Sequence, residues 1–563
     1  MPLRLPIGIS DFREIREGGF EYIDKSGLLV EMLDQAGIKV LLLPRPRRFG
    51  KTVNLSMLRY FFEKRPEDLS HLFEGLAVWN AGDAYRQHFQ RYPVIFLTFR
   101  EVKATTFEEC WSELKKKIRV LYGEHRALLE GEALREYERR DYQAILDDTA
   151  EPVLYRSALG DLSRYLHRAT GERAMILIDE YDEPIHAGFV NGYTSEILDF
   201  FRAFLTSGLK DNTSLARGVV TGILRIARES IFSGLNNITV FSLLRWEFST
   251  SFGFTEPEVH ILLEKAGRLD MIDDVRQAYN GYLFGRTVVY NPWSVLNFLA
   301  SESKTTAGYW VSVSANEIVR DLLIHHALDV KDDLTVLLQG GSVEQKLDEN
   351  VALQSLPHNE RALWSLLVFS GYLRAEPVET GGTEVPPYRL SIPNREVREV
   401  YTTTFHDWLT DRLRGHGGSL HLLTRALFEG DEDALEEQLR AFARDVLSYH
   451  DAGLLAPESL YHGFVAGLCA ALEPGHRVRS NRESGKGRPD VLILPIKPGD
   501  PGVVLELQVA RRKKTLDQAL DEGTAQAEEN DYAAEVRAAG ADPVHVFVIA
   551  FDGKEVRVRR VGA

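Results

Sequence analysis

Gly50, Lys51 and Thr52 are residue types that bind a nucleoside triphosphate when they lie between a strand and a helix. An apolar run, Ile38 to Leu43, precedes them and is typical of a buried parallel strand, and apolar residues after Thr52 recur at mainly helical spacing. At the start of such a helix the backbone N–H groups point at phosphate oxygens, the lysine reaches the terminal phosphates and the threonine hydroxyl ligates Mg²⁺. We therefore predict a nucleotide-binding loop made of Arg47, Arg48, Phe49, Gly50, Lys51 and Thr52.

Arg45 departs from the common form of this loop, because the pattern G-x-x-x-x-G-K-[ST] has its first glycine at that position. A basic turn that merely starts a helix is therefore the alternative. A matching acidic motif further along the chain would favour the nucleotide-binding interpretation.

Asp179 and Glu180 supply that motif, in the form of a Walker B sequence. They follow the apolar run 174–178, so we expect them at the carboxyl end of a strand, where a parallel sheet also places its phosphate loop. Asp179 would hold Mg²⁺, directly or through water, and Glu180 would polarise the attacking water. Asp182 and Glu183 follow closely, so a strand that ends in a solvated acidic turn is the alternative.

The segment 215–221 predicts a further strand, with Thr221 at its carboxyl end and Arg225 just beyond. A polar residue at this place would sense the γ-phosphate, which makes Thr221 the candidate sensor. Arg225 is the candidate for stabilising transition-state charge, with an ordinary surface arginine as the alternative.

Asp490 and Glu506 form a second group of chemically active residues, near the C-terminus. Asp490 opens one predicted strand and Glu506 lies within the next, across a turn rich in proline and glycine. Two acids on neighbouring strands can converge on one Mg²⁺, which activates water and neutralises developing charge in phosphodiester hydrolysis. The basic run 511–514 would hold a phosphate backbone, or it is a solvated charge run.

Composition limits the classes of protein that fit. The chain has 563 residues, with 44% hydrophobic and 27% charged side chains, as is ordinary for a globular protein of several domains. Its net charge of −16 excludes a constitutive polyanion binder, so any nucleic-acid contact must come from local patches. Two distant cysteines exclude a disulfide framework and a cysteine zinc site, and no apolar run approaches the ~18 residues that span a bilayer. We expect a cytoplasmic protein without membrane contact.

The elements that must position these residues indicate an α/β fold with four parts. We expect a P-loop core with a parallel sheet over residues 1–240 and a helical lid over 241–345. Residues 346–450 contain a helix, Leu363 to Leu373, that leads into a hairpin, which suits a winged helix and a helical linker. Residues 451–563 would form a separate α/β domain.

The first half resembles the AAA-ATPase-like proteins of bacteria and archaea. The motifs PRPRRFGKT, MILIDEYDEPI, VVTGILRIARESIFSGLNN, FGFTEPEV, YNGYLFG and VVYNPWSV carry the resemblance, which runs from about Pro6 to Trp310. These proteins are similar to signalling NTPases that couple a P-loop core to a winged-helix region. The family tends to carry a proline- and arginine-rich loop, so Arg45 is expected there. The resemblance also implies lid contacts to nucleotide at Asn291 and Pro292, with a purely structural turn as the alternative.

The C-terminal part resembles the PD-(D/E)xK nuclease superfamily, as an α/β restriction-endonuclease-like domain. The resemblance matches Asp490 and Glu506 to the two motif acids, and it matches Glu458 and Glu483 to additional upstream acids, with Glu483 as a metal ligand. Gln526 and Tyr532 match a following helix motif. Gln508 stands where the motif has lysine, so a fixed positive charge is missing from the catalytic set Asp490, Glu506 and Gln508.

Two functions follow from these expectations. The first is an ATP-binding and ATP-hydrolysing switch, with ATP and Mg²⁺ as cofactors, whose nuclease-fold domain acts on DNA or RNA. The alternative is an ATPase switch whose nuclease-like domain binds nucleic acid or a protein without cutting, because Gln508 replaces the lysine. The oligomeric state stays open: a nucleotide-dependent homo-oligomer would allow a neighbour to supply an arginine, whereas signalling NTPases also rest as monomers.

Overall fold

The computed structural model of the chain describes residues 3–224, 237–303, 305–310, 330–338, 340–350, 359–379, 386–414, 420–446, 475–480, 489–510, 514–552 and 555–562, and the single residues 319, 322, 356 and 472. It divides into two compact units. One comprises residues 1–319 and 344–397, and the other comprises residues 320–343 and 398–563.

A five-stranded parallel sheet forms the centre of the first unit. Its spatial order is β2 (Val94–Thr98), β3 (Ala174–Asp179), β4 (Leu215–Gly222), β1 (Val40–Pro44) and β5 (Ile238–Val240). The strands are almost continuous runs of buried apolar residues, because helices cover both faces of the sheet.

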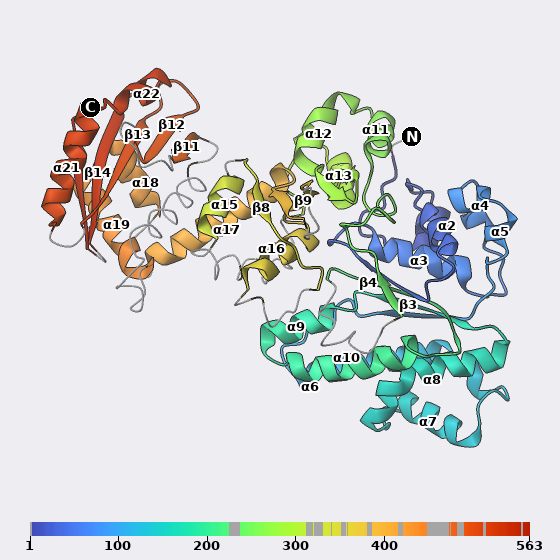
Figure 1. Cartoon of the computed structure of the whole chain (residues 1–563). Helices are drawn as coiled ribbons and strands as arrows, with labels where there is room; N and C mark the ends of the chain where they lie inside the picture. Colours follow the sequence, from blue (N-terminus) through green and yellow to red (C-terminus); the bar gives the residue numbers. More distant parts are fainter. Residues whose placement is uncertain are drawn as a thin grey trace. The chain divides into compact units, whose positions relative to one another are not determined.

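Figure 1 shows helices on either side of the sheet. One group consists of α1 (Phe12–Glu17), α2 (Gly27–Asp34), α3 (Lys51–Phe62), α4 (Ala77–Asn80) and α5 (Asp83–Arg86). The other consists of α6 (Phe107–Glu124), α7 (Glu136–Leu146), α8 (Pro152–Thr170), α9 (Glu183–Asn191) and α10 (Thr194–Leu209). Of these helices, α3, α6, α8 and α10 contact the strands of the sheet. The predicted core of parallel strands and helices is therefore confirmed.

Two smaller groups of elements complete the first unit. A helical group with its own apolar core contains α11 (Glu256–Lys265), α12 (Ile272–Tyr279), α13 (Pro292–Ala300) and the hairpin β6 (Tyr282–Phe284) and β7 (Thr287–Val289). A second group has α16 (Glu360–Phe369) followed by the antiparallel pair β9 (Arg374–Pro377) and β10 (Tyr388–Ser391), with β8 (Val343–Gln345) beside β10. This is the helix and hairpin expected for that segment.

The second unit is built on a mixed sheet in the order β11 (His476–Ser480), β12 (Val491–Pro495), β13 (Gly502–Val509), β14 (Val544–Asp552) and β15 (Glu555–Val561). Only the pair β13–β14 is parallel. The described helices of this unit include α15 (Lys331–Leu338), α17 (Arg395–Arg414), α18 (Leu420–Glu429), α19 (Glu432–Val446), α21 (Leu516–Glu529) and α22 (Ala533–Ala538), of which α17 begins three residues before the division.

Strand periodicity decides which side chains of β13 face α21. Val504 belongs to the apolar cluster formed with α21 and α22. Because strand side chains alternate between faces, Glu506 and Gln508 lie on this same face. Helix α18 packs near β13 as well, and α19 packs along β15.

Within the described residues, every helix is too short or too polar to cross a lipid bilayer.

Candidate nucleotide and metal sites

The loop between β1 and α3 has the backbone conformation that brings amide groups toward one point. Gly50 precedes α3 at φ +84°, a left-handed conformation that glycine adopts without the steric cost of a Cβ, and Arg48 is also left-handed at φ +69°. The first amides of α3 have no carbonyl acceptor inside the helix, so they are available to an anion.

Lys51 is buried at the centre of this loop. Its Nζ donates hydrogen bonds to the backbone carbonyls of Arg45 and Pro46, each at 3.0 Å. Burial lowers the pKa of Lys51, and the nearby charges of Glu180 and Asp182 oppose that shift. The ammonium group is thus held within the loop, beside the acids that follow β3.

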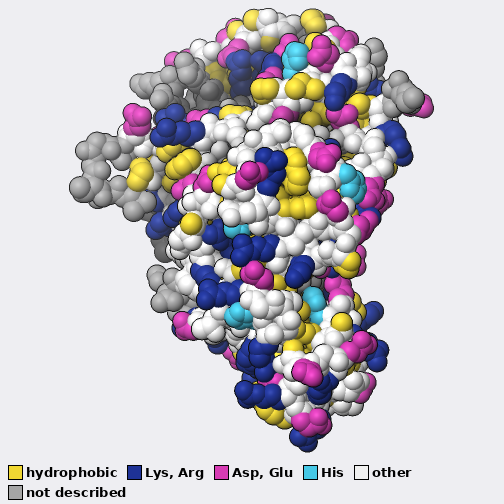
Figure 2. Space-filling model, turned by 90° about the vertical axis from the view of Figure 1, so that its right-hand side faces the viewer, with side chains coloured by type: hydrophobic (Ala, Val, Ile, Leu, Met, Phe, Trp, Pro, Cys, Tyr) yellow, Lys and Arg dark blue, Asp and Glu magenta, His cyan; other side chains and the backbone are white. Residues whose placement is uncertain are grey.

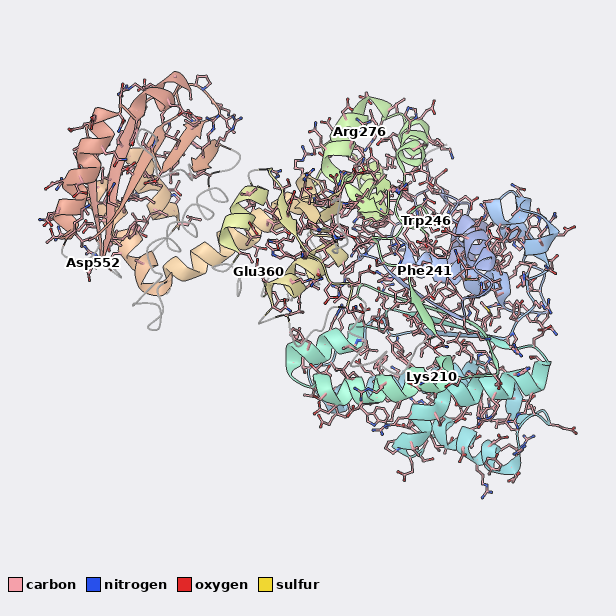
Figure 3. All side chains as sticks on the ribbon, in the orientation of Figure 1. Lys210, Phe241, Trp246, Arg276, Glu360 and Asp552 are labelled. Atoms are coloured by element: carbon pink, nitrogen blue, oxygen red, sulfur yellow. The ribbon has the colours of Figure 1, made fainter. Side chains whose placement is uncertain are left out.

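Arg45 occupies the place of the missing glycine and is fully buried. Its Nη1 donates to the carbonyls of Pro44 and Phe241 at 2.7 Å, and its guanidinium lies over the rings of Phe252 and Phe284. Burial lowers the pKa of Arg45 to about 9. Phe241, labelled in Figure 3, directly follows β5, so Arg45 ties the end of β1 to the chain beyond its neighbouring strand. The arginine therefore has a structural role in shaping the loop.

Asp179 links the loop between β1 and α3 to Thr221, the predicted sensor. Its Oδ2 accepts a hydrogen bond from the Thr52 hydroxyl at 2.8 Å, and its Oδ1 accepts one from the Thr221 hydroxyl at 2.7 Å. All three oxygen-bearing groups suit Mg²⁺, which prefers carboxylate and hydroxyl oxygens. Strand β4 lies between β1 and β3, which is why Thr221 at its carboxyl end comes between the other two.

Glu180 adopts a backbone conformation that is unusual for a residue with a side chain. Its φ is +50°, which costs about 1 kcal/mol or more and is found preferentially where function requires it. Burial raises the pKa of Glu180, while the charge of Lys51 opposes the shift. A carboxyl group with a raised pKa beside the phosphate loop suits a group that accepts a proton.

Asp182 and Tyr181 fix the segment that follows β4. Asp182 is buried, and its Oδ2 accepts from the backbone N–H groups of Ile223 at 2.7 Å and Leu224 at 3.0 Å. The Tyr181 hydroxyl donates to the Leu224 carbonyl at 2.7 Å. These contacts hold the chain just after Thr221; Arg225, the predicted charge-stabilising residue, lies outside the described residues.

The other two loop arginines contact different groups. Arg47 forms an ion pair with Glu183, at 3.2 Å between Nη2 and Oε2, and Lys103 binds the other oxygen of Glu183 at 2.8 Å. The Arg48 guanidinium stacks on Trp293, with Cζ 3.7 Å from the ring centroid. Phe49 is buried between the rings of Tyr282 and Phe284, which ties the loop to the hairpin β6–β7.

Asn291 caps helix α13. Its side-chain oxygen accepts from the backbone N–H groups of Trp293 and Ser294, and Pro292 takes the first helical position, where a missing N–H costs least. The turn expected here therefore has a structural role, while nucleotide contacts of Asn291 and Pro292 stay a prediction.

Asp490 and Glu506 lie together at the second candidate site. Val491 pairs with Leu505 across the antiparallel strands β12 and β13, so Asp490, one residue before β12, falls opposite Glu506. Asp490 Oδ2 accepts from the backbone N–H of Leu507 at 2.7 Å. The two carboxylates predicted to share a cation are thus brought to the same end of the β12–β13 pair.

Glu506 has an environment that fits a cation. Its side chain is 3% exposed, and Oε2 has no hydrogen-bond partner among the residues described. Burial raises the pKa of Glu506 to about 8, with a further contribution from the charge of Asp490. Burial also raises the pKa of Asp490. A buried and a half-buried carboxyl group, both with a raised pKa, are a donor set that a divalent cation would stabilise in the charged form.

Gln508 lies on the same face as Glu506, against α21. Its Nε2 is 3.3 Å from Glu506 Oε1, and a Cβ placed on Gly523 of α21 would lie 2.8 Å from Gln508 Cγ. The same Cβ would lie 2.5 Å from Val548 Cγ1, so a glycine at position 523 lets α21 pack closely on the side chains of both Gln508 and Val548. Further along, Gln526 Nε2 donates to the Tyr532 hydroxyl at 3.1 Å, so the two residues of the matched helix motif contact each other.

Several predicted residues lie outside the part of the chain that the structure describes: the upstream acids Glu458 and Glu483, and Arg511, Arg512 and Lys513 of the basic run. Sequence reasoning missed the roles of Asp182 and Glu183, which were interpreted only as local acidity. The signal available was their position directly after the strand that carries Asp179.

Comparisons with known proteins match the N-terminal part and the C-terminal part of the chain to two different families. Residues 6–232 match a family model described as "Predicted AAA-ATPase", and residues 456–561 match the PD-(D/E)XK nuclease superfamily. Both resemblances inferred from the motifs are confirmed. The chain is also 28% identical over 97% of its length to a curated protein of Azotobacter chroococcum mcd 1, named "Uncharacterized protein in vnfD 5'region", of which 96% is covered.

Proposed function

We propose that this chain is an ATP-hydrolysing switch coupled to a nuclease-fold domain that acts on DNA or RNA. The observation that carries the ATPase half is the Asp179 carboxylate, which joins the hydroxyls of Thr52 and Thr221 beside a buried Lys51. A strand ending in a solvated turn would not bury this carboxylate between two hydroxyls.

The residues divide the work of hydrolysis among them. Amides of the loop and the Lys51 ammonium bind the phosphates, and Thr52 and Asp179 would hold Mg²⁺, which neutralises phosphate charge when bound. Glu180 orients and deprotonates the attacking water, and Thr221 senses the γ-phosphate through its position on β4.

Two variants of the full chain test the ATPase. Lys51→Ala is expected to weaken ATP binding at least about tenfold, because it removes the buried charge that faces the phosphates. Glu180→Gln is expected to keep ATP affinity and lower kcat by roughly 10²–10³-fold, because an amide cannot take the proton. Normal turnover in Glu180→Gln would refute its assigned role, and circular dichroism would check that both variants are folded.

The nuclease-fold domain would act at Asp490 and Glu506. These carboxylates would hold a divalent cation that activates water, and Glu506 Oε2, which has no partner in the part of the chain that the structure describes, supports this donor set. Figure 2 shows Lys and Arg side chains intermixed with Asp and Glu on the face in view, as expected for a protein whose contacts to a phosphate backbone are local.

A domain that binds without cutting is the second candidate, and Gln508 favours it. Its amide offers hydrogen bonds but no fixed positive charge, and Lys514, the described member of the basic run, pairs with Glu522 on α21. Position 508 therefore lacks the positive charge that the motif lysine would supply.

Incubation of the full chain with labelled DNA and RNA, in Mg²⁺ or Mn²⁺ and with or without ATP, separates the two candidates. Cleavage that disappears in Asp490→Ala would support the nuclease. Retained binding without cleavage in both metals would support the binding domain instead.

A further inference from the structure

The three arginines of the phosphate loop have different partners, and one of them lies beside the hydrolytic acids. Arg45 is buried against backbone carbonyls, and Arg48 stacks on Trp293. Arg47 instead pairs with Glu183, which opens α9 only three residues after Glu180.

Glu183 holds Arg47 at a defined place. The carboxylate is buried, and it binds Arg47 through Oε2 and Lys103 through Oε1. The Arg47 charge also acts on the Lys51 ammonium, so both cations belong to one electrostatic environment at the loop. An anion that enters the loop would therefore attract both of them.

Lys103 allows Arg47 to leave Glu183 without exposing the carboxylate charge. The Lys103 side chain is 56% exposed and binds Glu183 Oε1, whereas the ion pair with Arg47 is through Oε2. If Arg47 turns to another anion, Glu183 keeps a counter-charge, so the large penalty of a bare buried carboxylate is avoided.

We infer that Arg47 stabilises the charge of the γ-phosphoryl group in the transition state and that Glu183 holds Arg47 when no γ-phosphate is present; this inference rests on the proposed ATPase function. In hydrolysis the water oxygen bonds to the γ-phosphorus while the bond to the β–γ bridging oxygen breaks, and the water proton passes to Glu180. Negative charge accumulates on the ADP leaving oxygen and on the γ-oxygens. The Arg47 guanidinium, with several fixed N–H donors, is suited to those oxygens.

Removal of the arginine tests the inference in the full chain. Arg47→Ala is expected to lower kcat at saturating ATP by roughly 10²–10³-fold while the Kd for ADP changes less than about threefold. Arg47→Lys is expected to recover ATP affinity better than rate, because an ammonium lacks the planar fork of donors. Arg86→Ala is the matched control, since Arg86 is an exposed arginine that pairs with Asp83 within α5.

Glu183→Gln tests the holding role. It removes the charge that competes for Arg47, so the affinity for a non-hydrolysable ATP analogue is expected to rise roughly three- to tenfold while ADP affinity stays constant. If Glu183 had only a structural role, Glu183→Gln would instead lower the melting temperature and weaken the binding of ADP and of the ATP analogue equally. That result would overturn the holding role.

The catalytic role has separate refuting outcomes. A kcat for Arg47→Ala within threefold of the wild type, or an equal loss of affinity for ADP and for the ATP analogue, would overturn it. A wild type that binds ATP but does not hydrolyse it would refute the proposed function instead. In that case the affinities would still test Arg47: if Arg47→Ala has the same ratio of analogue affinity to ADP affinity as the wild type, the inference is overturned.

Discussion

Gln508 stands at the position where the nuclease motif has a lysine. Its neighbour Glu506 is buried, and Glu506 Oε2 has no hydrogen-bond partner among the described residues, while Gly523 of α21 packs closely on the Gln508 side chain. We predict that Gln508→Lys raises the rate of DNA or RNA cleavage in Mg²⁺ by roughly 10²-fold, because an ammonium at this place stabilises developing phosphate charge. Gel assays with labelled substrates would measure the rate.

The control for this variant is Gln508→Met, which has a similar length and no charge. It is expected to show no gain. An equal gain in both variants would mean that packing, and not charge, limits the reaction.

The carboxyl of Glu506 links stability to pH. Its pKa is raised to about 8 in the folded chain, whereas the same carboxyl in the unfolded chain has the ordinary pKa of 4.5. The folded state therefore keeps a proton that the unfolded state loses, so stability is full below about pH 4.5 and declines by about 1.4 kcal/mol per pH unit as pH rises toward 8.

We predict that Glu506→Gln removes this decline. In EDTA the variant and the wild type should melt at similar temperatures at pH 5, and the variant should melt higher at pH 8.5. Differential scanning calorimetry of both proteins would measure the difference. Parallel pH profiles would show that Glu506 is ionised in the folded protein across this range.

The hydroxyl of Thr221 has one described acceptor, Asp179 Oδ1. We predict that Thr221→Val lowers kcat for ATP roughly tenfold, because it leaves a buried carboxylate oxygen without its donor, and that Thr221→Ser retains most of the rate. Steady-state ATPase assays would measure both. Equal losses in the two variants would indicate that the methyl group, through packing, is what matters.

At the scale of elements, helix α19 covers the edge of the second sheet. Glu436 Oε2 accepts from the Val558 N–H at 3.0 Å, Glu432 Oε2 accepts from the Arg560 N–H at 2.7 Å, and Arg440 donates to the Val556 carbonyl. Side chains one helical turn apart thus satisfy alternate backbone groups of β15, which would otherwise be open to pairing with another chain.

We predict that the double variant Glu432→Ala and Glu436→Ala loses about 1–3 kcal/mol of stability and self-associates on heating. Light scattering during a thermal ramp would detect the association. Glu437→Ala on the same helix is the control, and aggregation equal to that of the control would show that these contacts do not protect the edge.

The strands of the first sheet differ in how well the sequence predicts them. The sequence identified β1, β3 and β4, because each of these strands contains an uninterrupted stretch of buried residues. Strand β5, Ile238–Val240, was missed because three residues carry no periodicity. The order of the strands, with β4 between β1 and β3, depends on tertiary packing and could not be derived from local pattern.

The candidate sites were predictable where chemistry and strand ends coincide. Asp179 and Asp490 were identified because each lies at the edge of an apolar run, and Lys51 was identified by the Gly-Lys-Thr motif that follows such a run. The partners of Arg45 and Arg47 were not, because their contacts lie about 140 to 200 residues away in sequence. Long-range pairing of this kind leaves no local signal.

At the scale of the whole molecule, the switch hypothesis requires coupling between ATP and nucleic acid. We predict that Glu180→Gln loaded with ATP and the same variant loaded with ADP differ in affinity for nucleic acid by roughly five- to 150-fold. Linkage requires that nucleic acid change the ATP affinity of Glu180→Gln by the same factor relative to ADP. Fluorescence anisotropy in both directions would measure the two factors, and equal affinities in both nucleotide states would refute the coupling.

The close packing of Gly523 on Gln508 has an evolutionary consequence. Codons for glutamine and lysine differ only in their first base, so one transversion would place the motif lysine at position 508. A side chain at position 523 would crowd residue 508, so retaining the glycine keeps this single mutational step open.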